Sequence, residues 1–512
     1  MIRMSATQIK LFDKLLIAPL IFYYIAIQSL PGLYQLYFYQ FLIFKIQIMS
    51  SDRRKFIKQL GSTIILTSAG LTSLAAQEEH ERRILQAEKR ITPNDKIRIA
   101  TIGMGIMGYN DTHAALQSPG IELAACCDLY KGRLDRAKEL YGPNIFTTGD
   151  YREILNRKDI DAVIIATSDN WHSRIATEAM RNGKAVYSEK PMVHYISEGL
   201  DEIRTQKETK AVFQVGSQRI SSIAFQKAKE MFQAGAIGKI NTIQASFNRQ
   251  NALGAWQYTI PLDASPQTVD WERFQATEKV KHAYEANRFF RWRNYREYGT
   301  GVAGDLFVHL LTGINYLTNS KGPDKIFSIG DLTYWKDGRN VPDVMTAVIQ
   351  YPETKEHPAF QVSLQVNFIS GEGERTTTRV IGSEGVIDLS GEGDGFTIHK
   401  NKMAVAPGIG GWDSLSTYPE SMQKALMDDY NKKYSAADQQ IPKLDPVTYM
   451  APDGYNASNE HFANFFDSMR TGKAVVEDAE FGFRAAAPAL ACNDSYFQNK
   501  TIHWDPINMK IV

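Results

Sequence analysis

The stretch that decides the fold covers residues 97–130 and reads IRIATIGMGIMGYNDTHAALQSPGIELAACCDLY. An apolar, β-branched run ends in the glycine motif Gly103-Met-Gly105-Ile-Met-Gly108, a helical pattern follows, and a second apolar run ends at Asp128. Gly103 permits a tight turn, Gly105 lets a pyrophosphate approach the backbone, and Gly108 lets the helix pack closely on the strand. The free N–H groups of the helix N-terminus then face the phosphates. This order of elements predicts a dinucleotide-binding unit, whereas the bare glycine motif would be weak support.

Asp128 indicates which dinucleotide is bound. Its carboxylate can accept hydrogen bonds from the ribose hydroxyls and repels a 2′-phosphate, so NAD is favoured over NADP. Further cofactor contacts are expected from the polar stretches that follow later strands, because ligands bind beyond the carboxyl ends of parallel strands. The full set of expected cofactor-binding residues is Gly103, Gly105, Ile106, Met107, Gly108, Asp128, Arg133, Thr167, Asn170, His172, Glu189 and Lys190.

Length, charge and cysteine content bound the class of protein. A chain of 512 residues is too long for one compact core, so two domains and extra segments are expected. The net charge of +1 argues against nucleic acid as a partner, since a phosphate-backbone binder needs a basic face. Cys126 and Cys127 are neighbours on an expected strand and point to opposite faces, so they should pack in the core. We expect no disulfide and no metal site.

The N-terminal part resembles an export signal behind an unusual extension. Residues 15–44 carry no charge over a length that could span a membrane. Arg53 and Arg54, an apolar stretch and small residues then follow in the order of a twin-arginine signal, and Met49 lies just before them. We expect residues 1–48 to be an over-extended start or else a membrane anchor, residues 49–76 to be the signal peptide, and residues 77–95 to be an arm or linker.

The rest of the chain predicts two α/β domains. Short apolar runs alternate with helical patterns through residues 96–216, which predicts a Rossmann domain with a doubly wound parallel sheet. Residues 217–512 show longer strands with partial alternation, which predicts a substrate-binding and oligomerisation domain with an open, mostly antiparallel sheet. Its expected strands cover residues 240–247, 326–334, 344–350, 361–368, 376–381 and 386–389, and its expected helices residues 223–234, 305–316 and 481–497. We expect surface loops and a short helix within residues 418–458.

Three residues are candidates for catalysis. Lys190 follows an expected strand, where it can stabilise the charge that develops on a substrate oxygen. Asp305 and His309 lie four residues apart on an expected helix, so they share one face and place an acid beside a base. A histidine that only packs on an amphipathic helix remains the alternative. Arg291, Trp292 and Arg293 mix planar donors with an aromatic ring, which suits a sugar, and we expect them and Arg219 to bind substrate.

The ordered motifs resemble those of the Gfo/Idh/MocA oxidoreductases, the family of glucose-fructose oxidoreductase and inositol dehydrogenases. The motifs are IGMGIMG, CD, ATSDNWH, SEKP, QVGSQR, RWRNY and GDLFVH, and the likeness covers about residues 96–505. The resemblance implies a Rossmann domain joined to a domain with an open antiparallel sheet, NAD(P) as cofactor, and catalysis by Lys190, Asp305 and His309. Between Asp305 and His309 the chain has Leu306-Phe307-Val308 where inositol dehydrogenases show a glycine, so we expect a different substrate floor.

These observations lead to one main hypothesis and two alternatives. We expect an exported, periplasmic enzyme that uses tightly held NAD(H), recycled in place, to oxidise or reduce a secondary hydroxyl of a sugar, glycoside or cyclic polyol, and that forms a homo-oligomer. The first alternative is an NAD-dependent glycosidase that oxidises, eliminates and reduces in one cycle, with Tyr295, Glu297 or Tyr298 as an extra base. The second is a sugar-binding protein without activity, against which the intact Lys190, Asp305 and His309 argue.

Overall fold

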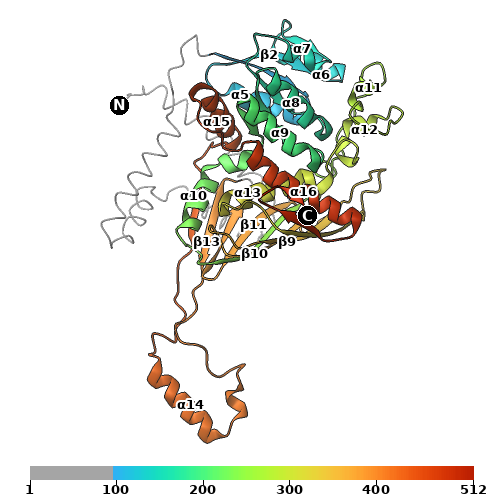
Figure 1. The fold of residues 1–512 in the computed structure, drawn as a ribbon. Helices are drawn as coiled ribbons and strands as arrows, with labels where there is room; N and C mark the ends of the chain where they lie inside the picture. The colour runs from blue at the N-terminus through green and yellow to red at the C-terminus, as the bar shows by residue number, and fades with distance from the viewer. Residues whose placement is uncertain (1–95, 392) are drawn as a thin grey trace, which may run out of the picture. The chain divides into compact units, whose positions relative to one another are not determined.

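The computed structural model describes residues 96–391 and 393–512. They belong to a compact unit that runs from Ile91 to Val512 (Figure 1). The expected membrane or over-extended segment, the twin-arginine signal and the arm at 77–95 lie outside these residues. Within the described residues, no helix is both long and apolar enough to cross a membrane.

Six parallel strands form the first sheet, in the order β3-β2-β1-β4-β5-β6. The central strands are buried apolar runs, as expected where helices cover both faces. The strand order reverses between β1 and β4, which is the point where such sheets bind ligands. The expected Rossmann sheet is confirmed. Its strands are β1 (Ile97–Ile102), β2 (Ile121–Cys127), β3 (Phe146–Thr148), β4 (Ala162–Ile165), β5 (Ala185–Ser188) and β6 (Phe213–Val215), and its helices are α5 (Ile106–Leu116), α6 (Lys131–Tyr141), α7 (Tyr151–Leu155), α8 (His172–Arg181) and α9 (Ile196–Thr209).

The neighbouring cysteines at the end of β2 pack into different cores. Cys126 contacts the cluster that contains Met104 and Ala137, whereas Cys127 belongs to the main core. Both side chains are buried free thiols. Their expected packing on opposite faces of the strand is confirmed, since successive strand residues alternate in direction.

Ten strands form the second sheet, in the order β14-β13-β12-β11-β7-β10-β9-β8-β15-β16. β7 and β10 pair in parallel and the other neighbours are antiparallel, as expected. The strands are β7 (Ile240–Asn248), β8 (Lys325–Asp331), β9 (Val344–Tyr351), β10 (Phe360–Asn367), β11 (Arg375–Gly382), β12 (Gly385–Ser390), β13 (Gly395–Lys400), β14 (Val447–Met450), β15 (Ile502–Asp505) and β16 (Lys510–Ile511). The last four were not expected, because they are short and lack a clear alternation.

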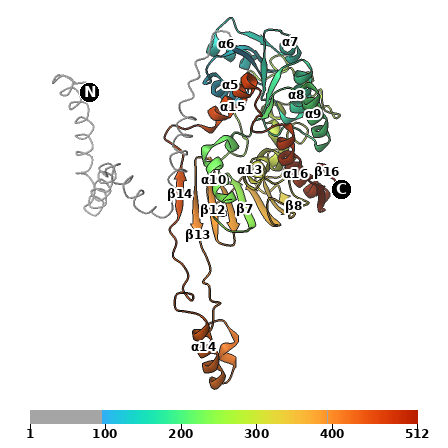
Figure 2. The same ribbon diagram turned by 60° about the vertical axis from the view of Figure 1, so that its left-hand side comes forward.

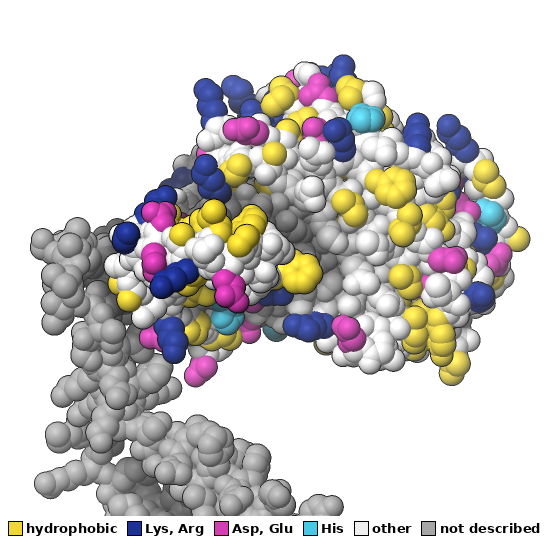
Figure 3. Space-filling model, turned by 90° about the horizontal axis from the view of Figure 1, so that it is seen from below, with side chains coloured by type: hydrophobic (Ala, Val, Ile, Leu, Met, Phe, Trp, Pro, Cys, Tyr) yellow, Lys and Arg dark blue, Asp and Glu magenta, His cyan; other side chains and the backbone are white. Residues whose placement is uncertain are grey.

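Helices cover only one face of this second sheet (Figures 1 and 2). In β10, Val362 and Leu364 are buried toward the helices, whereas Gln361, Ser363 and Gln365 point outward. The outward face is seen from below in Figure 3, where uncharged polar and hydrophobic side chains occupy much of its middle. The alternation of buried and exposed residues is what a sheet with one covered face requires.

The helix expected at residues 305–316 begins with an irregular segment. A π-helical turn covers Ala303–Phe307, and the regular helix α13 covers Val308–Thr318. π-Turns are rare, and they widen the helix locally, often at functional sites. Asp305 lies in the π-turn and His309 just after it. Their common side of the helix therefore depends on this turn as well as on regular helical spacing.

The C-terminal part of the chain connects the two sheets. Helix α15 (Ala457–Thr471) packs on α5, and its Phe462, Phe465 and Phe466 complete a core with β1 and β4. Helix α16 (Ala479–Gln498) packs between α9 of the first domain and α13 and β8 of the second. The helix expected at 481–497 thus packs on both domains, and the sequence alone did not show which domain it would contact.

An excursion between β13 and β14 leaves the second sheet. Residues 401–446 extend away from it in both ribbon views, and they carry helix α14 (Glu420–Lys433) near their far end (Figures 1 and 2). Against the described residues, none of the α14 side chains is buried. The expectation of loops and a short helix at 418–458 is correct only in part, because α14 has 14 residues and the same stretch also contains β14 and the start of α15 (Ala457–Thr471).

We predict that replacing residues 403–444 by a short Gly-Asn turn leaves the fold intact, because α14 buries nothing against the described core. β13 and β14 already pair as neighbours in an antiparallel hairpin, so a short turn can join them. The thermal midpoint should change by less than about 3 °C, since a surface change usually costs under about 0.5 kcal/mol. A drop of about 10 °C would show that the excursion carries part of the core.

Candidate functional site

A cavity of about 710 Å³ lies where the carboxyl ends of the Rossmann strands face the second domain. The first domain contributes the glycine motif, Asp128 and the loops after β4 and β5. The second domain contributes the end of β7, the residues that follow it, and the helix of Asp305 and His309. Side chains of both domains would therefore contact a molecule bound in this cavity.

The glycine motif has the geometry that the sequence predicts. Gly103 has a φ of +92°, and a Cβ there would lie 2.5 Å from the carbonyl oxygen of Ala166. A Cβ on Gly108 would lie 1.8 Å from the carbonyl oxygen of Gly103. Gly105, Ile106 and Met107 line the cavity. Gly108 does not line it, so its role is the close packing of α5 on the strand.

Asp128 holds the glycine motif while it lines the cavity. Its carboxylate accepts hydrogen bonds from the backbone N–H of Met104 (2.7 Å) and of Tyr130 (2.8 Å). Arg133, which also lines the cavity, donates to Asp128 Oδ2 at 3.4 Å and lies over the ring of Phe290. Asp128 is 6% exposed, which excludes a solvated aspartate at the strand end. It presents negative charge where the ribose hydroxyls are expected.

The loop after β4 places two of the three residues that we expect to contact the cofactor in the wall of the cavity. Thr167 and His172 line the cavity. His172 Nδ1 lies 2.8 Å from the carbonyl oxygen of Pro191 and Nε2 lies 3.2 Å from that of Thr167, while burial lowers the pKa of the ring. The structure corrects the expectation for Asn170, which does not line the cavity. Its amide donates to Thr277 Oγ1 at 2.8 Å, because the second domain packs against this loop.

The same loop positions the helix of the second domain. Asp169 Oδ2 accepts hydrogen bonds from both the backbone N–H (2.9 Å) and the hydroxyl (2.8 Å) of Thr300. Asp169 is 1% exposed, so water does not compete for these bonds. Thr300 lies immediately before the helical segment that contains Asp305. A buried, charge-assisted pair of bonds therefore fixes the start of that segment relative to the Rossmann loop.

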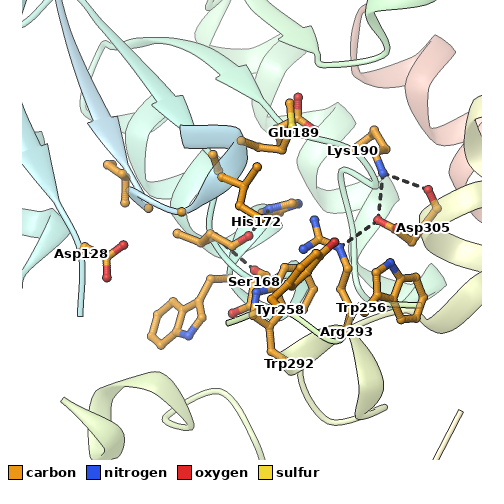
Figure 4. A pocket seen from close by; sticks show the side chains of 18 of the residues that line it. Asp128, Ser168, His172, Glu189, Lys190, Trp256, Tyr258, Trp292, Arg293 and Asp305 are labelled. Atoms are coloured by element: carbon orange, nitrogen blue, oxygen red, sulfur yellow. Dashed lines mark hydrogen bonds and ion pairs between the residues drawn. The ribbon is translucent and has the colours of Figure 1, made fainter. Parts of the chain in front are cut away.

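Lys190, Asp305 and Arg293 form the charged centre of the cavity (Figure 4). Lys190 Nζ donates to the carboxylate of Asp305 at 2.8 Å and to its carbonyl oxygen at 2.9 Å. Arg293 Nε donates to the same carboxylate oxygen at 3.3 Å. Lys190 follows β5 of the first domain, and both partners belong to the second. The structure thus brings together residues that the sequence places 115 positions apart.

The charges around Asp305 and His309 set their protonation states. Burial alone would raise the pKa of Asp305. The charges of Lys190 and Arg293 outweigh this effect and hold the pKa below its ordinary value, so the carboxyl stays ionised. Burial lowers the pKa of His309 well below its ordinary value, and the charges of Lys190 and Arg219 add to this effect. His309 lines the cavity as a neutral ring. A neutral imidazole can accept a proton from a hydroxyl.

Glu189 lines the cavity beside Lys190 and is 4% exposed. Burial raises its pKa to about 7, although the charge of Lys190 and a hydrogen bond from Gln218 Nε2 (2.8 Å) oppose the rise. A Cβ on Gly216 would lie 2.4 Å from the Glu189 carboxylate, which shows how tightly that group is enclosed. Glu189 is therefore a closely packed part of the cavity wall, and its contact with a cofactor stays a prediction.

The RWRNY segment at 291–295, which we expect to bind substrate, lines the cavity only in part. Trp292 and Arg293 line the cavity, but the structure corrects the expectation for Arg291, which does not. Arg291 Nε donates to the carbonyl oxygen of Tyr258 at 2.8 Å, so its guanidinium holds a neighbouring loop instead of a substrate. The other expected substrate residue, Arg219, lines the cavity.

The three proposed extra bases do not line the cavity. Tyr295 and Tyr298 are buried behind Phe274, Phe289 and Phe290, which belong to the same aromatic cluster and do line it, and Glu297 faces Arg288 and Asn340. These side chains are used in packing and ion pairs, because the segment folds back on the first domain. The structure therefore corrects their assignment as bases near a substrate.

Several lining residues were not expected from the sequence. Trp256, Tyr258 and Arg249 come from the segment after β7, and Figure 4 shows Trp256 and Tyr258 beside the pair of Arg293 and Asp305. Burial raises the pKa of Tyr258. The arginine and aromatic residues of RQNALGAWQY at 249–258 were the available signal, but nothing in that stretch shows which side of the sheet it covers. Tyr455–Ser458, at the start of α15, also line the cavity.

A segment of the second domain packs beside Asp128 at one end of the cavity. We call residues 261–298 the strap; it contains α11 (Trp271–Phe274) and α12 (Ala286–Phe290). The strap pairs with the first domain through the bridge between Val269 and Tyr130 and through the indole of Trp171, which donates to the carbonyl oxygen of Phe274 at 2.9 Å. Phe274 and both phenylalanines of α12 line the cavity opposite Asp128.

Comparison with known proteins agrees with this two-domain site. Residues 97–217 match the oxidoreductase family Gfo/Idh/MocA with NAD-binding Rossmann fold, and residues 274–388 match the Gfo/Idh/MocA C-terminal domain. A glycosyl hydrolase family 109 protein of Shewanella sp. (strain ANA-3) is 28% identical over 303 residues, which are 56% of this chain and 61% of that protein. An alpha-N-acetylgalactosaminidase of Shewanella oneidensis is 31% identical over 173 residues, 31% of this chain and 37% of that protein. The chain thus spans about three-fifths or less of these relatives' length.

Solved structures share the fold at low sequence identity. A levoglucosan dehydrogenase in complex with NADH and levoglucosan has a TM-score of 0.55 at 18% identity and covers 80% of this chain and 99% of its own. The WlbA dehydrogenase of Bordetella pertussis, in complex with NADH and UDP-GlcNAcA, has a TM-score of 0.56 at 15% identity with the same coverage. These structures show the fold, and the two family models show a match in each domain, to the NAD-binding Rossmann domain of Gfo/Idh/MocA oxidoreductases in the first and to their C-terminal domain in the second.

Proposed function

We propose that the protein is an NAD(H)-dependent oxidoreductase that acts on a secondary hydroxyl of a sugar, glycoside or cyclic polyol and recycles a tightly held cofactor. The observation that carries this proposal is the contact of Lys190 with Asp305 across the two domains. It places a lysine from the cofactor side and an ionised carboxylate from the substrate side in one cavity with a neutral His309. Such a set of groups can take the proton from a hydroxyl oxygen while the carbon that carries this oxygen loses a hydride.

The side chains have separate tasks in such a reaction. Bound NAD supplies the hydride acceptor. Lys190 can donate a hydrogen bond to the substrate oxygen and stabilise negative charge as it develops there. His309 can take the hydroxyl proton, because burial and the neighbouring cations keep its ring neutral. Asp305 holds Lys190 and Arg293 in place through the two bonds to its Oδ1.

The rest of the substrate side suits a carbohydrate. Trp256, Tyr258 and Trp292 provide flat apolar surfaces with polar edges, and Arg293 adds planar donors. A buried ion pair is costly unless it has further use, so a protein that only binds sugar would gain little from Lys190 and Asp305. The complex of the fold neighbour with levoglucosan supports the same class of substrate.

Retention of the cofactor is supported by the strap. Its aromatic cluster of Trp271, Phe274, Phe289 and Tyr298 packs on Tyr130 of the first domain, next to Asp128. Arg273 of the strap also donates to the carbonyl oxygen of Gly149 at 2.6 Å. A dinucleotide bound beneath this cover would need the strap to open before it could leave.

A glycosidase is the second candidate, and the relatives of glycosyl hydrolase family 109 favour it. In that cycle a carbon that carries a ring hydroxyl is oxidised to a ketone, the acidified neighbouring C–H bond loses its proton as the aglycone leaves, water adds to the double bond so formed, and the hydride returns to the ketone. The extra base would be Tyr258, which lines the cavity. Release of aglycone without net NADH would identify this reaction.

Export and assembly complete the proposal. Arg53 and Arg54 with the apolar stretch behind them support translocation of the folded, cofactor-loaded protein to the periplasm, with Met49 as the start. Exposed Phe327, Ile329 and Val348 on β8 and β9 support association of copies through the outer face of the second sheet.

We predict that Lys190→Ala and His309→Ala each lower turnover by about 100-fold, since acid–base groups typically contribute about 10²- to 10⁴-fold. Cofactor affinity should remain nearly unchanged, because the glycine motif and Asp128 are untouched. Single-turnover reduction of bound NAD by a sugar panel measures the first effect, and titration of NAD into stripped protein measures the second. Lys239→Ala, an exposed lysine outside the cavity, is the matched control. Wild-type turnover in either variant would remove that residue from the mechanism.

We predict that purified protein retains NAD(H) through gel filtration and turns over repeatedly without added cofactor when given a donor and an acceptor sugar, or one glycoside. Trp271→Ala should accelerate NAD dissociation at least about tenfold, because removing a buried tryptophan from the strap costs about 3 to 5 kcal/mol. Trp412→Ala, at a fully exposed tryptophan of the excursion, is the control. Turnover that stops after one equivalent of product unless NAD is supplied would refute recycling.

We predict that a chain starting at Met49 is exported and cut near Ala75 or Ala76, and that residues 1–48 are dispensable. Mass spectrometry of the mature protein from the periplasm measures the cut, and Arg53→Lys with Arg54→Lys should abolish export because the twin-arginine pair is the recognised signal. A mature N-terminus upstream of Met49, or retention in the membrane, would contradict this start.

A further inference from the structure

The substrate side of the cavity carries an excess of positive charge. Among the described residues that line this side and its border with the cofactor site, four are cationic and three carry carboxyl groups. These are Lys190, Arg219, Arg249 and Arg293, against Glu189, Asp305 and Asp394, and burial raises the pKa of Glu189 to about 7. Asp305 is already bonded to Lys190 and Arg293. Asp394 is exposed and accepts from the hydroxyl of Ser390, so it compensates little of the charge deeper in the cavity.

Arg249 is the cation with the least compensation. It follows β7, and its guanidinium carbon lies 4.7 Å from the centroid of the Phe247 ring. Within residues 96–391 and 393–512, its Nε is buried and has no hydrogen-bond acceptor. A planar guanidinium that stacks on a ring keeps its donor edge free for an oxyanion. The cofactor does not supply that oxyanion, because its phosphates belong at the N-terminus of α5 in the other domain.

The position of Arg249 relative to the reacting groups is also defined. The Phe247 ring lies 6.1 Å, centroid to centroid, from the ring of His309. The charge of Arg249 contributes to the lowered pKa of His309, which is consistent with this proximity. Arg219 lies over the same Phe247 ring, 5.2 Å from its centroid. A group bound by Arg249 would therefore belong to the substrate molecule whose hydroxyl meets His309.

We propose that the substrate is an acidic carbohydrate, whose carboxylate, sulfate or phosphate group is bound by Arg249. This inference rests on the proposed oxidation of a sugar hydroxyl and narrows its substrate class. The anion would accept hydrogen bonds from the guanidinium of Arg249 where this side chain lines the cavity, and it would offset the excess positive charge around His309.

The test compares matched sugars on the NAD-loaded protein. The probes are the methyl glycosides of glucose and galactose, the corresponding glucuronides and galacturonides, and galactose 6-sulfate and 6-phosphate. Reduction of bound NAD gives kcat/KM, and calorimetry gives binding independently of turnover. We expect at least one anionic probe to exceed its neutral partner at least about tenfold, as charged hydrogen bonds typically allow. The anionic probe with the highest kcat/KM and affinity shows whether the bound group is a carboxylate, a sulfate or a phosphate.

Variants assign the preference to Arg249. Arg249→Gln should remove at least about tenfold of the anionic advantage while changing the neutral sugars by less than about threefold, and Arg249→Lys should restore part of it. Arg379→Gln, at an exposed arginine paired with Asp388 on β11 and β12, is the control. A wild-type preference for neutral sugars, or an equal loss on both classes in Arg249→Gln, would overturn the inference. If no sugar reduces NAD, the proposed oxidation fails, while Arg249-dependent binding of the anionic probes by calorimetry still decides this point.

Discussion

The site depends on one ion pair that crosses the two domains, that of Lys190 with Asp305. Each partner is nearly buried, and separation of the domains would leave Lys190 without its carboxylate and Asp305 with Arg293 alone. The bonds from Thr300 to Asp169 hold the helical segment that makes this meeting possible. The same pair keeps Asp305 ionised and contributes to the neutral state of His309. Structural and chemical roles are therefore carried by the same few groups.

Several elements around this pair form the walls of the cavity and supply the side chains that would contact a ligand. The strap closes the Asp128 end of the cavity with aromatic rings, whereas the segment after β7 closes the substrate side with Trp256, Tyr258 and Arg249. α16 packs on both domains and so limits their relative displacement. Both domains therefore contribute to the walls of the cavity.

Local sequence patterns were sufficient for the first domain. The glycine motif, the apolar strands and Asp128 lie within 32 consecutive residues, and their geometry follows from turn and helix rules that act over that distance. The second sheet was predicted where strands alternate clearly, as in β9 and β10, and was missed where they are short, as in β15. Asn170 and Arg291 were expected in the cavity because their residue types suit ligand binding. Their side chains instead form hydrogen bonds with Thr277 and with the backbone of Tyr258, which the local sequence does not indicate.

The sequence by itself determined the parallel sheet, the dinucleotide motif and the identity of Lys190, Asp305 and His309 as candidates, because periodicity and motif spacing are local properties. Only the tertiary structure decided which of the many polar side chains share one cavity. It brought Arg249 and Tyr258 to the substrate side, and it moved Tyr295, Glu297 and Tyr298 into the strap and its ion pairs. The physical reason is that burial and charge compensation depend on contacts between segments over 100 residues apart, such as Lys190 with Asp305, which no local pattern encodes.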